Sequence, residues 1–299
     1  MYLKFKHWSK KVLLITVLLV VVSCSVVSLG YNRLPTIALS QLDTIFDLTD
    51  EQSNLVRPEL DRWLQWHRTV HLPQYVNKLQ RFEKLIVQDL TAKQFCEEFE
   101  DIKRFADEAA IQFIPALIPI AKTLTKEQIE NWNKYQSKQD EEFIINFGRG
   151  PKGEKINEKR LEKAIDRAEM FYGSLTIQQK EFLAKRLERS VFNVEQVLPE
   201  RKRRHQEALN AVSLIQKGAS PIQTLQTVWR HNQQSPNPMY AAYSNRMLQD
   251  GCSQLAELHN KTTKEQRRKA AQKLNGYAKD FQNLIKSDRK STRLNSSHT

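Results

Sequence analysis

The sequence predicts an all-α fold, a bundle of long amphipathic helices, on three observations. Apolar residues recur every three or four positions through most of the chain, for example at Phe95, Phe99, Ile102, Phe105, Ala109, Phe113 and Leu117. That spacing is typical of a helix with one buried face. Only 8 Gly and 10 Pro occur in 299 residues, and no segment alternates apolar and polar residues as a half-buried strand would. The third observation is a repeated signature of helix starts.

This signature is a Thr or Ser placed three positions before a Gln. The hydroxyl group can accept a hydrogen bond from the amide three residues on, while the Gln side chain accepts one from the first residue's own amide. Such a capping box predicts a helix that begins directly after each of Thr49, Thr91, Thr125, Thr176, Ser220 and Thr263.

The chain begins with what we expect to be a signal peptide, residues 1–23. Four lysines precede the apolar stretch Val12–Val22, and the first 42 positions contain no acidic residue; this order is typical of exported proteins. As a helix the stretch would rise about 16 Å, half of the ~30 Å hydrocarbon core of a membrane. The alternative is an uncleaved anchor that continues to Leu29, although four Ser and Thr residues dilute that longer span.

The apolar stretch ends at Val21-Val22-Ser23-Cys24, which resembles the lipobox of bacterial lipoproteins. The resemblance implies a diacylglyceryl group on the Cys24 thiol, cleavage before Cys24, and acylation of the new amino terminus. Several acyl chains form a stable anchor, since each buried methylene contributes about 0.8 kcal/mol. Residues 24–30 would then be a lipidated tether. By analogy with sorting in Gram-negative bacteria, Ser25 in place of Asp favours the outer membrane, with the protein facing the periplasm.

The order of the later signals predicts two related helical halves, residues 31–147 and 157–287. In the first half Thr49 precedes Leu72-Pro73 and two further caps, and in the second Thr176 precedes Leu198-Pro199 and two further caps. The distances from cap to Pro are 24 and 23 residues. A repeat of this kind indicates duplication, and independent use of the same cap is the alternative. Within the first half, Pro115 and Pro119 are expected to kink or break a long apolar helix.

A Gly-rich linker, residues 148–156, joins the halves. It contains Gly148-Arg149-Gly150-Pro151-Lys152-Gly153, formally a G-x-G-x-x-G sequence. A dinucleotide site needs a strand before those glycines and a helix directly after them, so we expect a hinge and no nucleotide. The last segment, residues 288–299, resembles a translated adapter sequence. It is expected to be an unstructured tail and a sequence artefact, with a natural polar tail as the alternative. In either case it should be left out of reasoning about the fold.

Charge limits the classes of partner. The chain carries a formal net charge of +13, which falls to +7 for residues 24–287 once the four lysines of residues 1–23 and the net +2 of residues 288–299 are removed. This modest charge suits anionic lipid or polysaccharide surfaces and excludes the electrostatic footprint of a nucleic-acid-binding protein.

Two cysteines remain besides Cys24. In an oxidising compartment Cys96 and Cys252 either form a disulfide across about 156 residues, worth about 4–5 kcal/mol on the chain-entropy argument, or are two half-buried helix cysteines.

Two further clusters have both a functional and a structural interpretation. His67 and His71 have the i, i+4 spacing of metal ligands, but Arg68 lies between them and no third ligand is evident, so we expect no metal. The two rings would instead pack under Trp63 and Trp66 or pair with acids. The run of Arg201, Lys202, Arg203 and Arg204 is either a solvated basic face or a patch that contacts phosphates of lipopolysaccharide or carboxylates of peptidoglycan.

The segment Leu29–Gln52, LGYNRLPTIALSQLDTIFDLTDEQ, followed by Trp66-His67-Arg68 and Leu72-Pro73-Gln74-Tyr75, resembles a family of Gram-negative lipoproteins classed as domain of unknown function 6279. That resemblance implies a lipoprotein of unassigned role and supplies no catalytic residues. A looser resemblance, carried mostly by the L-T-x-x-Q caps, is to periplasmic stress chaperones of the Spy and CpxP type.

These observations favour a non-enzymatic, lipid-anchored envelope protein, a helical binding or chaperone-like module that needs no cofactor. The alternative is an enzyme, or an enzyme accessory, that acts on peptidoglycan or lipid at a site between the halves. A deep polar pocket with convergent acids and histidines would favour the enzyme, and a shallow apolar cradle would favour the binding module.

Overall fold

A computed structural model describes residues 30–148 and 158–296, with side chains to residue 287, and it confirms the all-α prediction. Within these residues every regular element is a helix. The elements before the linker are α2 (Leu34–Phe46), α3 (Asp50–Trp66), the π-helix η1 (His67–His71), α4 (Leu72–Leu85), α5 (Ala92–Thr123) and α6 (Lys126–Phe147). Those after it are α7 (Glu158–Tyr172), α8 (Ile177–Glu188), α9 (Val194–Gln216), α10 (Pro221–Gln233), α11 (Pro238–Asn260) and α12 (Lys264–Ser296).

Five of the six expected capping boxes form. At the start of α3, for example, the Gln52 amide donates to Thr49 Oγ1 over 3.3 Å, and the Thr49 amide donates to Gln52 Oε1 over 3.0 Å. At the sixth position the predicted helix start is confirmed, since α10 begins at Pro221, but the predicted capping bond is wrong because the Ser220 side chain makes no cap hydrogen bond. Ser220 has ψ of 115°, whereas Thr49 has ψ of 164°.

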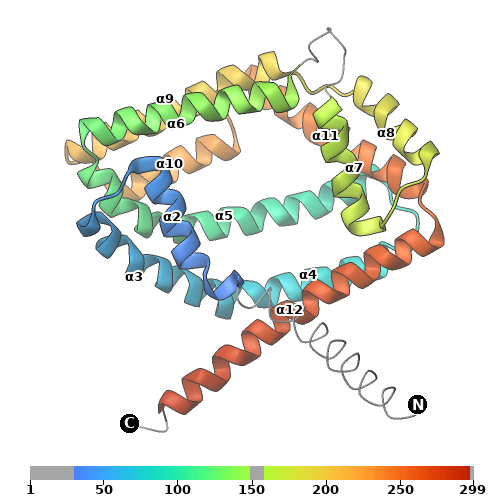
Figure 1. The fold of residues 1–299 in the computed structure, drawn as a ribbon, viewed down its shortest axis with the longest axis horizontal. Coiled ribbons are helices and arrows are strands. Elements are labelled where there is room, and N and C mark those ends of the chain that lie inside the picture. The colour runs from blue at the N-terminus through green and yellow to red at the C-terminus, as the bar shows by residue number, and fades with distance from the viewer. Residues whose placement is uncertain (1–29, 149–157, 297–299) are drawn as a thin grey trace, which may run out of the picture.

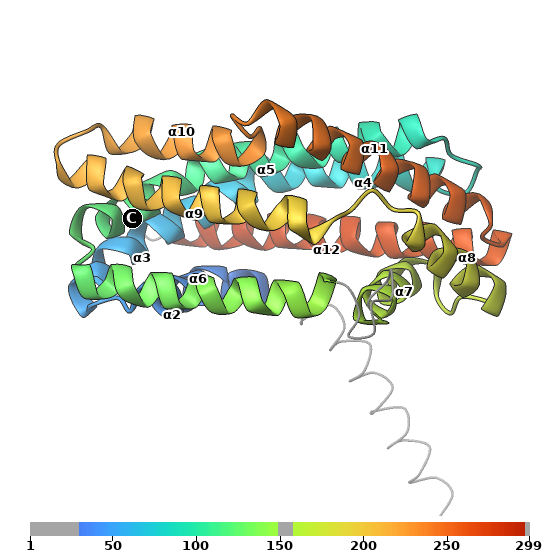
Figure 2. The ribbon, with the colours of Figure 1, turned by 90° about the horizontal axis from the view of Figure 1, so that it is seen from above.

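The helices form a frame around α5, which crosses the middle of the molecule in Figure 1. Helix α12 packs on α4, α6 packs on α9, and α5 packs on both α10 and α11. Figure 2 shows α10 and α11 along one side of the assembly and α6 and α7 along the other. Helices from before and after the linker therefore interlock, and the two predicted halves are not separate compact bodies.

Apolar burial holds this frame in two large clusters and one small one. The first cluster joins Phe95 of α5 to Leu183 of α8 and Leu274 of α12, and the second joins Leu60 of α3 to Ile120 of α5 and Ile215 of α9. Burying a Leu or Ile side chain completely is worth about 1.5–3 kcal/mol. Both clusters draw on α5, so this one helix connects the two ends of the molecule.

The capping glutamines also join helices to one another, in two matching pairs. Gln52 of α3 and Gln128 of α6 exchange side-chain hydrogen bonds of 3.2 and 2.8 Å. Gln179 of α8 and Gln266 of α12 do the same over 2.8 and 2.9 Å. Gln128 donates to the carbonyl two residues before Thr49, and Gln266 donates to the carbonyl two residues before Thr176. A duplication of the chain would produce two such matching pairs. The pairing of the glutamines was not evident from the sequence, and the duplication itself remains a prediction.

Two expectations about helix ends need correction. Helix α5 is continuous through Pro115 and Pro119, so these prolines do not separate two helices. Helix α12 continues to Ser296, beyond the body of the protein in Figure 1, so residues 288–296 are helical and not an unstructured tail. No Gly or Pro follows Gly276, and the sequence therefore contains no residue that would stop the helix.

Several predictions lie outside the described residues. These are the signal peptide, Cys24 with its tether as far as residue 29, and the linker after Gly148. Within the part of the chain that the structure describes, no helix combines the length and the apolar character needed to cross a bilayer.

Candidate functional site

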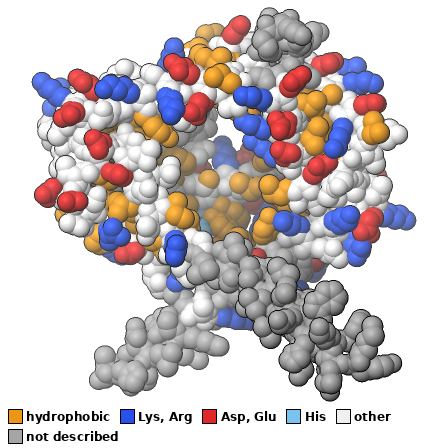
Figure 3. Space-filling view, viewed as in Figure 1, with side chains coloured by type: hydrophobic (Ala, Val, Ile, Leu, Met, Phe, Trp, Pro, Cys, Tyr) orange, Lys and Arg blue, Asp and Glu red, His pale blue; other side chains and the backbone are white. Residues whose placement is uncertain are grey.

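Two apolar grooves lie along opposite halves of α5, each with a volume of about 490 Å³. The tether-side groove is bounded by α2, α3, the C-terminal half of α5, and α10. The disulfide-side groove is bounded by the N-terminal half of α5 together with α4, α7, α8, α11 and α12. Figure 3 shows that the face of Figure 1 is hollowed at its centre and that apolar side chains gather there. Both volumes fall in the range of small-ligand sites.

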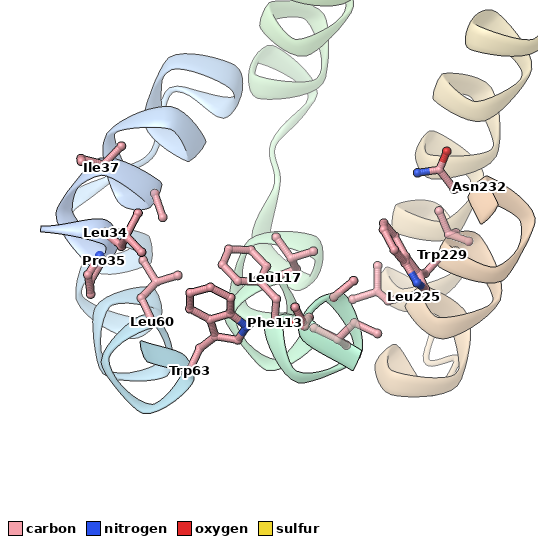
Figure 4. A pocket seen from close by; sticks show the side chains of 15 residues that line it. Leu34, Pro35, Ile37, Leu60, Trp63, Phe113, Leu117, Leu225, Trp229 and Asn232 are labelled. Carbon is pink, nitrogen blue, oxygen red and sulfur yellow. Dashed lines mark hydrogen bonds between the residues drawn. The ribbon is translucent and has the colours of Figure 1, made fainter. Parts of the chain in front are cut away.

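The tether-side groove is formed almost entirely by hydrocarbon and aromatic surface. In Figure 4, Phe113 and Leu117 of α5 form the floor between a wall of α2 and α3 and a wall of α10. The lining side chains labelled there are Leu34, Pro35, Ile37, Leu60, Trp63, Phe113, Leu117, Leu225, Trp229 and Asn232. Among the described residues that line this groove, Asn232 alone has an amide or charged side chain.

Both indoles of this groove have their polar atoms occupied elsewhere. Trp63 Nε1 donates to the carbonyl of Ala109 over 2.9 Å, and Trp229 Nε1 donates to Asp107 Oδ1 over 3.1 Å. A buried indole N–H that is already bonded leaves the ring face free for apolar contact. An occupant of this groove would therefore meet no hydrogen-bond donor from either tryptophan.

The disulfide-side groove combines an apolar floor with a polar rim. Phe82, Phe95, Phe99, Ile102, Phe171 and Leu255 supply much of its apolar lining. Glu98, Arg167 and Gln254 add polar groups, and Glu98 forms an ion pair of 2.7 Å with Lys78. Figure 1 shows that this end of the molecule is built from α7, α8 and α11 around the N-terminal half of α5.

A disulfide bond joins Cys96 of α5 to Cys252 of α11. Each cysteine directly neighbours a residue that lines the disulfide-side groove, Phe95 in one case and Gly251 in the other. The bond therefore fixes the spacing between two walls of the groove. A Cβ added at Gly251 would meet no atom within 4 Å, which shows open space above this glycine.

His67 and His71 belong to a buried chain of hydrogen bonds. The Leu72 amide donates to the His67 carbonyl five residues back, and this π-helical turn places both rings inside the protein. The chain runs from Tyr31 to His67 (2.8 Å), to Tyr75 (3.3 Å), to His71 (2.9 Å) and to Glu108 (2.9 Å).

This chain has the electrostatics of an enclosed structural network. Burial, aided by the nearby His71, lowers the pKa of His67 to about 4, and burial with the nearby Glu108 raises the pKa of Tyr75 to about 12. Trp63 stacks on His67 and Trp66 lies against His71, which has no exposed surface. The described residues contain no cluster of His, Cys, Asp and Glu suited to a metal ion.

The basic segment at the start of α9 is engaged within the chain. Arg201 pairs with Asp140 of α6 over 2.7 Å, while Arg203 and Arg204 both bond to Glu200 over 2.8 and 3.0 Å. Burial of Glu200, whose side chain is only 3 % exposed, acts to raise the pKa of its carboxyl group. The guanidinium groups of Arg203 and Arg204 outweigh this effect and lower that pKa. Three of the four cations are thus occupied in ion pairs, which leaves Lys202 as the remaining cation of the run.

Sequence reasoning did not find the grooves. Their residues come from helices far apart in the chain, and Trp63 and Trp229 carry no local signal that would place them on facing walls. Pro115 lies between Phe113 and Leu117 in the sequence, but neither Pro115 nor Pro119 lines the tether-side groove.

Comparison with known proteins gives one match. The protein-family model DUF6279, described as a family of unknown function, matches residues 44–240, about two thirds of the chain. No curated protein and no solved structure matches.

Proposed function

This chain belongs to the family of unknown function DUF6279, and we propose that it is a lipid-anchored envelope protein that binds apolar polypeptide segments without catalysis. The anchor is the acylated Cys24 expected from the lipobox, and its location is the periplasmic face of the outer membrane of a Gram-negative bacterium. The binding site is the disulfide-side groove. A disulfide between Cys96 and Cys252 supports an oxidising compartment such as the periplasm.

The single observation that carries the binding proposal is the mixed lining of the disulfide-side groove. A polypeptide offers apolar side chains but also carries a backbone whose amides and carbonyls need partners when they leave water. The floor of Phe82, Phe95 and Phe99 suits the side chains, and the rim of Arg167 and Gln254 can serve the polar atoms. A mature net charge of +7 further favours acidic amphipathic segments.

An enzyme is less well supported by this geometry. General acid–base catalysis needs a titratable group within hydrogen-bond reach of a substrate. His71 is completely buried, and both of its ring nitrogens are bonded to Tyr75 and Glu108. Glu98, the carboxylate that lines the disulfide-side groove, is paired with Lys78. The mostly apolar lining of the groove therefore favours the binding module over the enzyme.

The test uses two glycines that both have open space above them. Gly251→Leu places an isobutyl group in the disulfide-side groove, and Gly276→Leu places the same group on the exposed side of α12. Each replaces a helical glycine, so neither variant should lose stability. The probe is a fluorescent amphipathic peptide of leucine and glutamate, followed by fluorescence anisotropy.

We expect Gly251→Leu to weaken binding of this peptide at least tenfold and Gly276→Leu to leave it unchanged. Equal binding by both variants would rule out the disulfide-side groove as the binding site. Failure of the unmodified protein to bind the peptide would contradict the proposed function itself.

A further inference from the structure

We propose that the tether-side groove hosts one of the acyl chains carried by Cys24 of the same molecule. The inference rests on the lipid anchor of the proposed function but not on peptide binding, which uses the other groove. It gives the apolar surface between α2 and α10 a definite occupant, a saturated hydrocarbon chain attached to this protein's own amino terminus.

The position of the groove supports this occupant. Leu34 and Pro35, at the start of α2, line the groove, and Cys24 lies only ten residues before Leu34. A fully extended segment of ten residues spans at most about 33–36 Å. The chain length therefore keeps Cys24 within about 36 Å of Leu34, which limits the distance that an attached acyl chain has to reach.

The end of the tether is also fixed to the wall of the groove. Tyr31, the second described residue, is hydrogen-bonded to His67 over 2.8 Å, and the Arg68 guanidinium lies 5.3 Å from the centre of the Tyr31 ring. His67 in turn stacks on Trp63, which lines the groove. The chain thus leaves the folded body beside the groove.

The chemistry of the lining distinguishes a hydrocarbon from a peptide. Both indole N–H groups are already bonded within the protein, and Asn232 is the single amide side chain that the described residues contribute to the lining. A peptide backbone placed here would lose its hydrogen bonds to water without replacement, at a cost of about 1–3 kcal/mol per group. A methylene chain has no such requirement.

The protein can stay anchored when one of its three acyl chains leaves the membrane. The lipobox implies three acyl chains, whereas two membrane signals are enough for a stable anchor. Because the third chain is linked to the protein, its effective concentration at the groove is on the order of millimolar, as for other short flexible linkers. Occupancy would hold α2 and α10 close to the bilayer surface and keep the apolar lining from water.

The experiment places a photo-crosslinker on the far wall of the groove in the full-length protein inside cells. Trp229→p-benzoylphenylalanine reports on the tether-side groove, and Phe171→p-benzoylphenylalanine reports on the disulfide-side groove. After irradiation and tryptic digestion, mass spectrometry searches for the acylated peptide 24–33 joined to the peptide 218–230. Fragment ions of the product locate the new bond on the acyl chain or on the peptide itself, and only a bond to the acyl chain supports the inference.

We expect at least ten times more of this product from position 229 than the equivalent product from position 171. Adding Ile37→Asp, a change on the groove wall at a residue 48 % exposed, should abolish it, whereas Ile222→Asp, 50 % exposed and outside the lining, should not.

Three outcomes would overturn the inference. An acylated amino-terminal peptide without any crosslink to 218–230 would show an unoccupied groove while the anchor stands. A phospholipid adduct on 218–230 would identify a lipid of the bilayer as the occupant. An amino-terminal peptide without acyl groups would contradict the anchor and the inference together.

Discussion

Trp63 stacks on His67 with their ring centroids 4.9 Å apart. One face of this pair belongs to the tether-side groove, and the other continues into the buried chain through Tyr75 and His71 to Glu108. Trp63 in the groove wall therefore packs against the buried hydrogen-bonded chain, and burial sets the protonation state of that chain. Changes in that network should reach the groove through a single aromatic contact.

The first prediction concerns the pH dependence of stability. His67 has an ordinary pKa of 6.5 and a folded pKa of about 4, so between these values the unfolded chain binds the additional proton. His67 therefore contributes up to about 3 kcal/mol to the free energy of unfolding above pH 6.5, and this contribution is lost as the pH falls towards 4. Replacement by Gln keeps a hydrogen-bonding side chain and removes the titration.

Urea unfolding at pH 7 and at pH 4.5 measures this effect. The free energy of unfolding of the unmodified protein should fall relative to that of His67→Gln by about 2–3 kcal/mol between the two conditions. Parallel pH profiles for the two proteins would show that His67 is protonated as readily in the folded state as in the unfolded state.

A second prediction concerns the paired capping glutamines. Gln266→Leu removes one hydrogen-bond partner from Gln179, whose side chain is 4 % exposed, and also from the Thr263 amide and the Ser174 carbonyl. It should destabilise the protein by about 1–3 kcal/mol because these groups lose hydrogen bonds. The matched control is Gln223→Leu, the same change after Ser220, where no capping bond forms. That variant should stay within about 0.5 kcal/mol of the original in urea unfolding. Equal losses at both positions would contradict the structural role of the pair.

The third prediction is that the basic segment of α9 is structural. Arg203 bonds to Glu200 and Glu207, and its removal leaves a nearly buried carboxylate short of a partner. Arg203→Ala should lower the free energy of unfolding by about 3 kcal/mol, whereas Lys202→Ala should change it by less than about 0.5 kcal/mol. Thermal unfolding distinguishes the two. Loss of binding to anionic vesicles in both variants, with no loss of stability, would restore the anion-contacting interpretation.

The fourth prediction concerns the disulfide between Cys96 and Cys252, which closes a loop with a sequence separation of 156 residues. On the chain-entropy argument a loop of that length stabilises the fold by about 5 kcal/mol. A reductant should therefore lower the urea midpoint of the unmodified protein strongly. The double variant Cys96→Ser, Cys252→Ser should unfold at that lower midpoint with or without reductant. An unmodified protein that is insensitive to reductant would contradict a stabilising bond.

Helix starts were predictable because a capping box is a local structure. Thr176 and Gln179 lie within one turn, and their side chains need only each other's backbone to form the motif. After Ser220 the helix also begins where the sequence predicts it, at Pro221, although the capping hydrogen bond does not form. The all-α fold class was predictable for the same reason, because the helical spacing of apolar residues is also a local property of the sequence.

The grooves and the histidine chain depended on contacts across the whole chain. Trp229 lines its groove because α10 packs on α5, and Asp107 accepts its indole hydrogen from 122 positions away. His67 and His71 have the spacing of ligands on an α-helix, yet a π-helical turn and Tyr75 make them links in a hydrogen-bonded chain. Periodicity carries no information about either arrangement.

Both proposals depend on an acylated Cys24, so the most direct measurement is the intact mass of the protein purified from the membranes of its native host. We expect a polypeptide that begins at Cys24 and carries three acyl chains. A chain that still begins at Met1 and carries no acyl group would contradict this expectation.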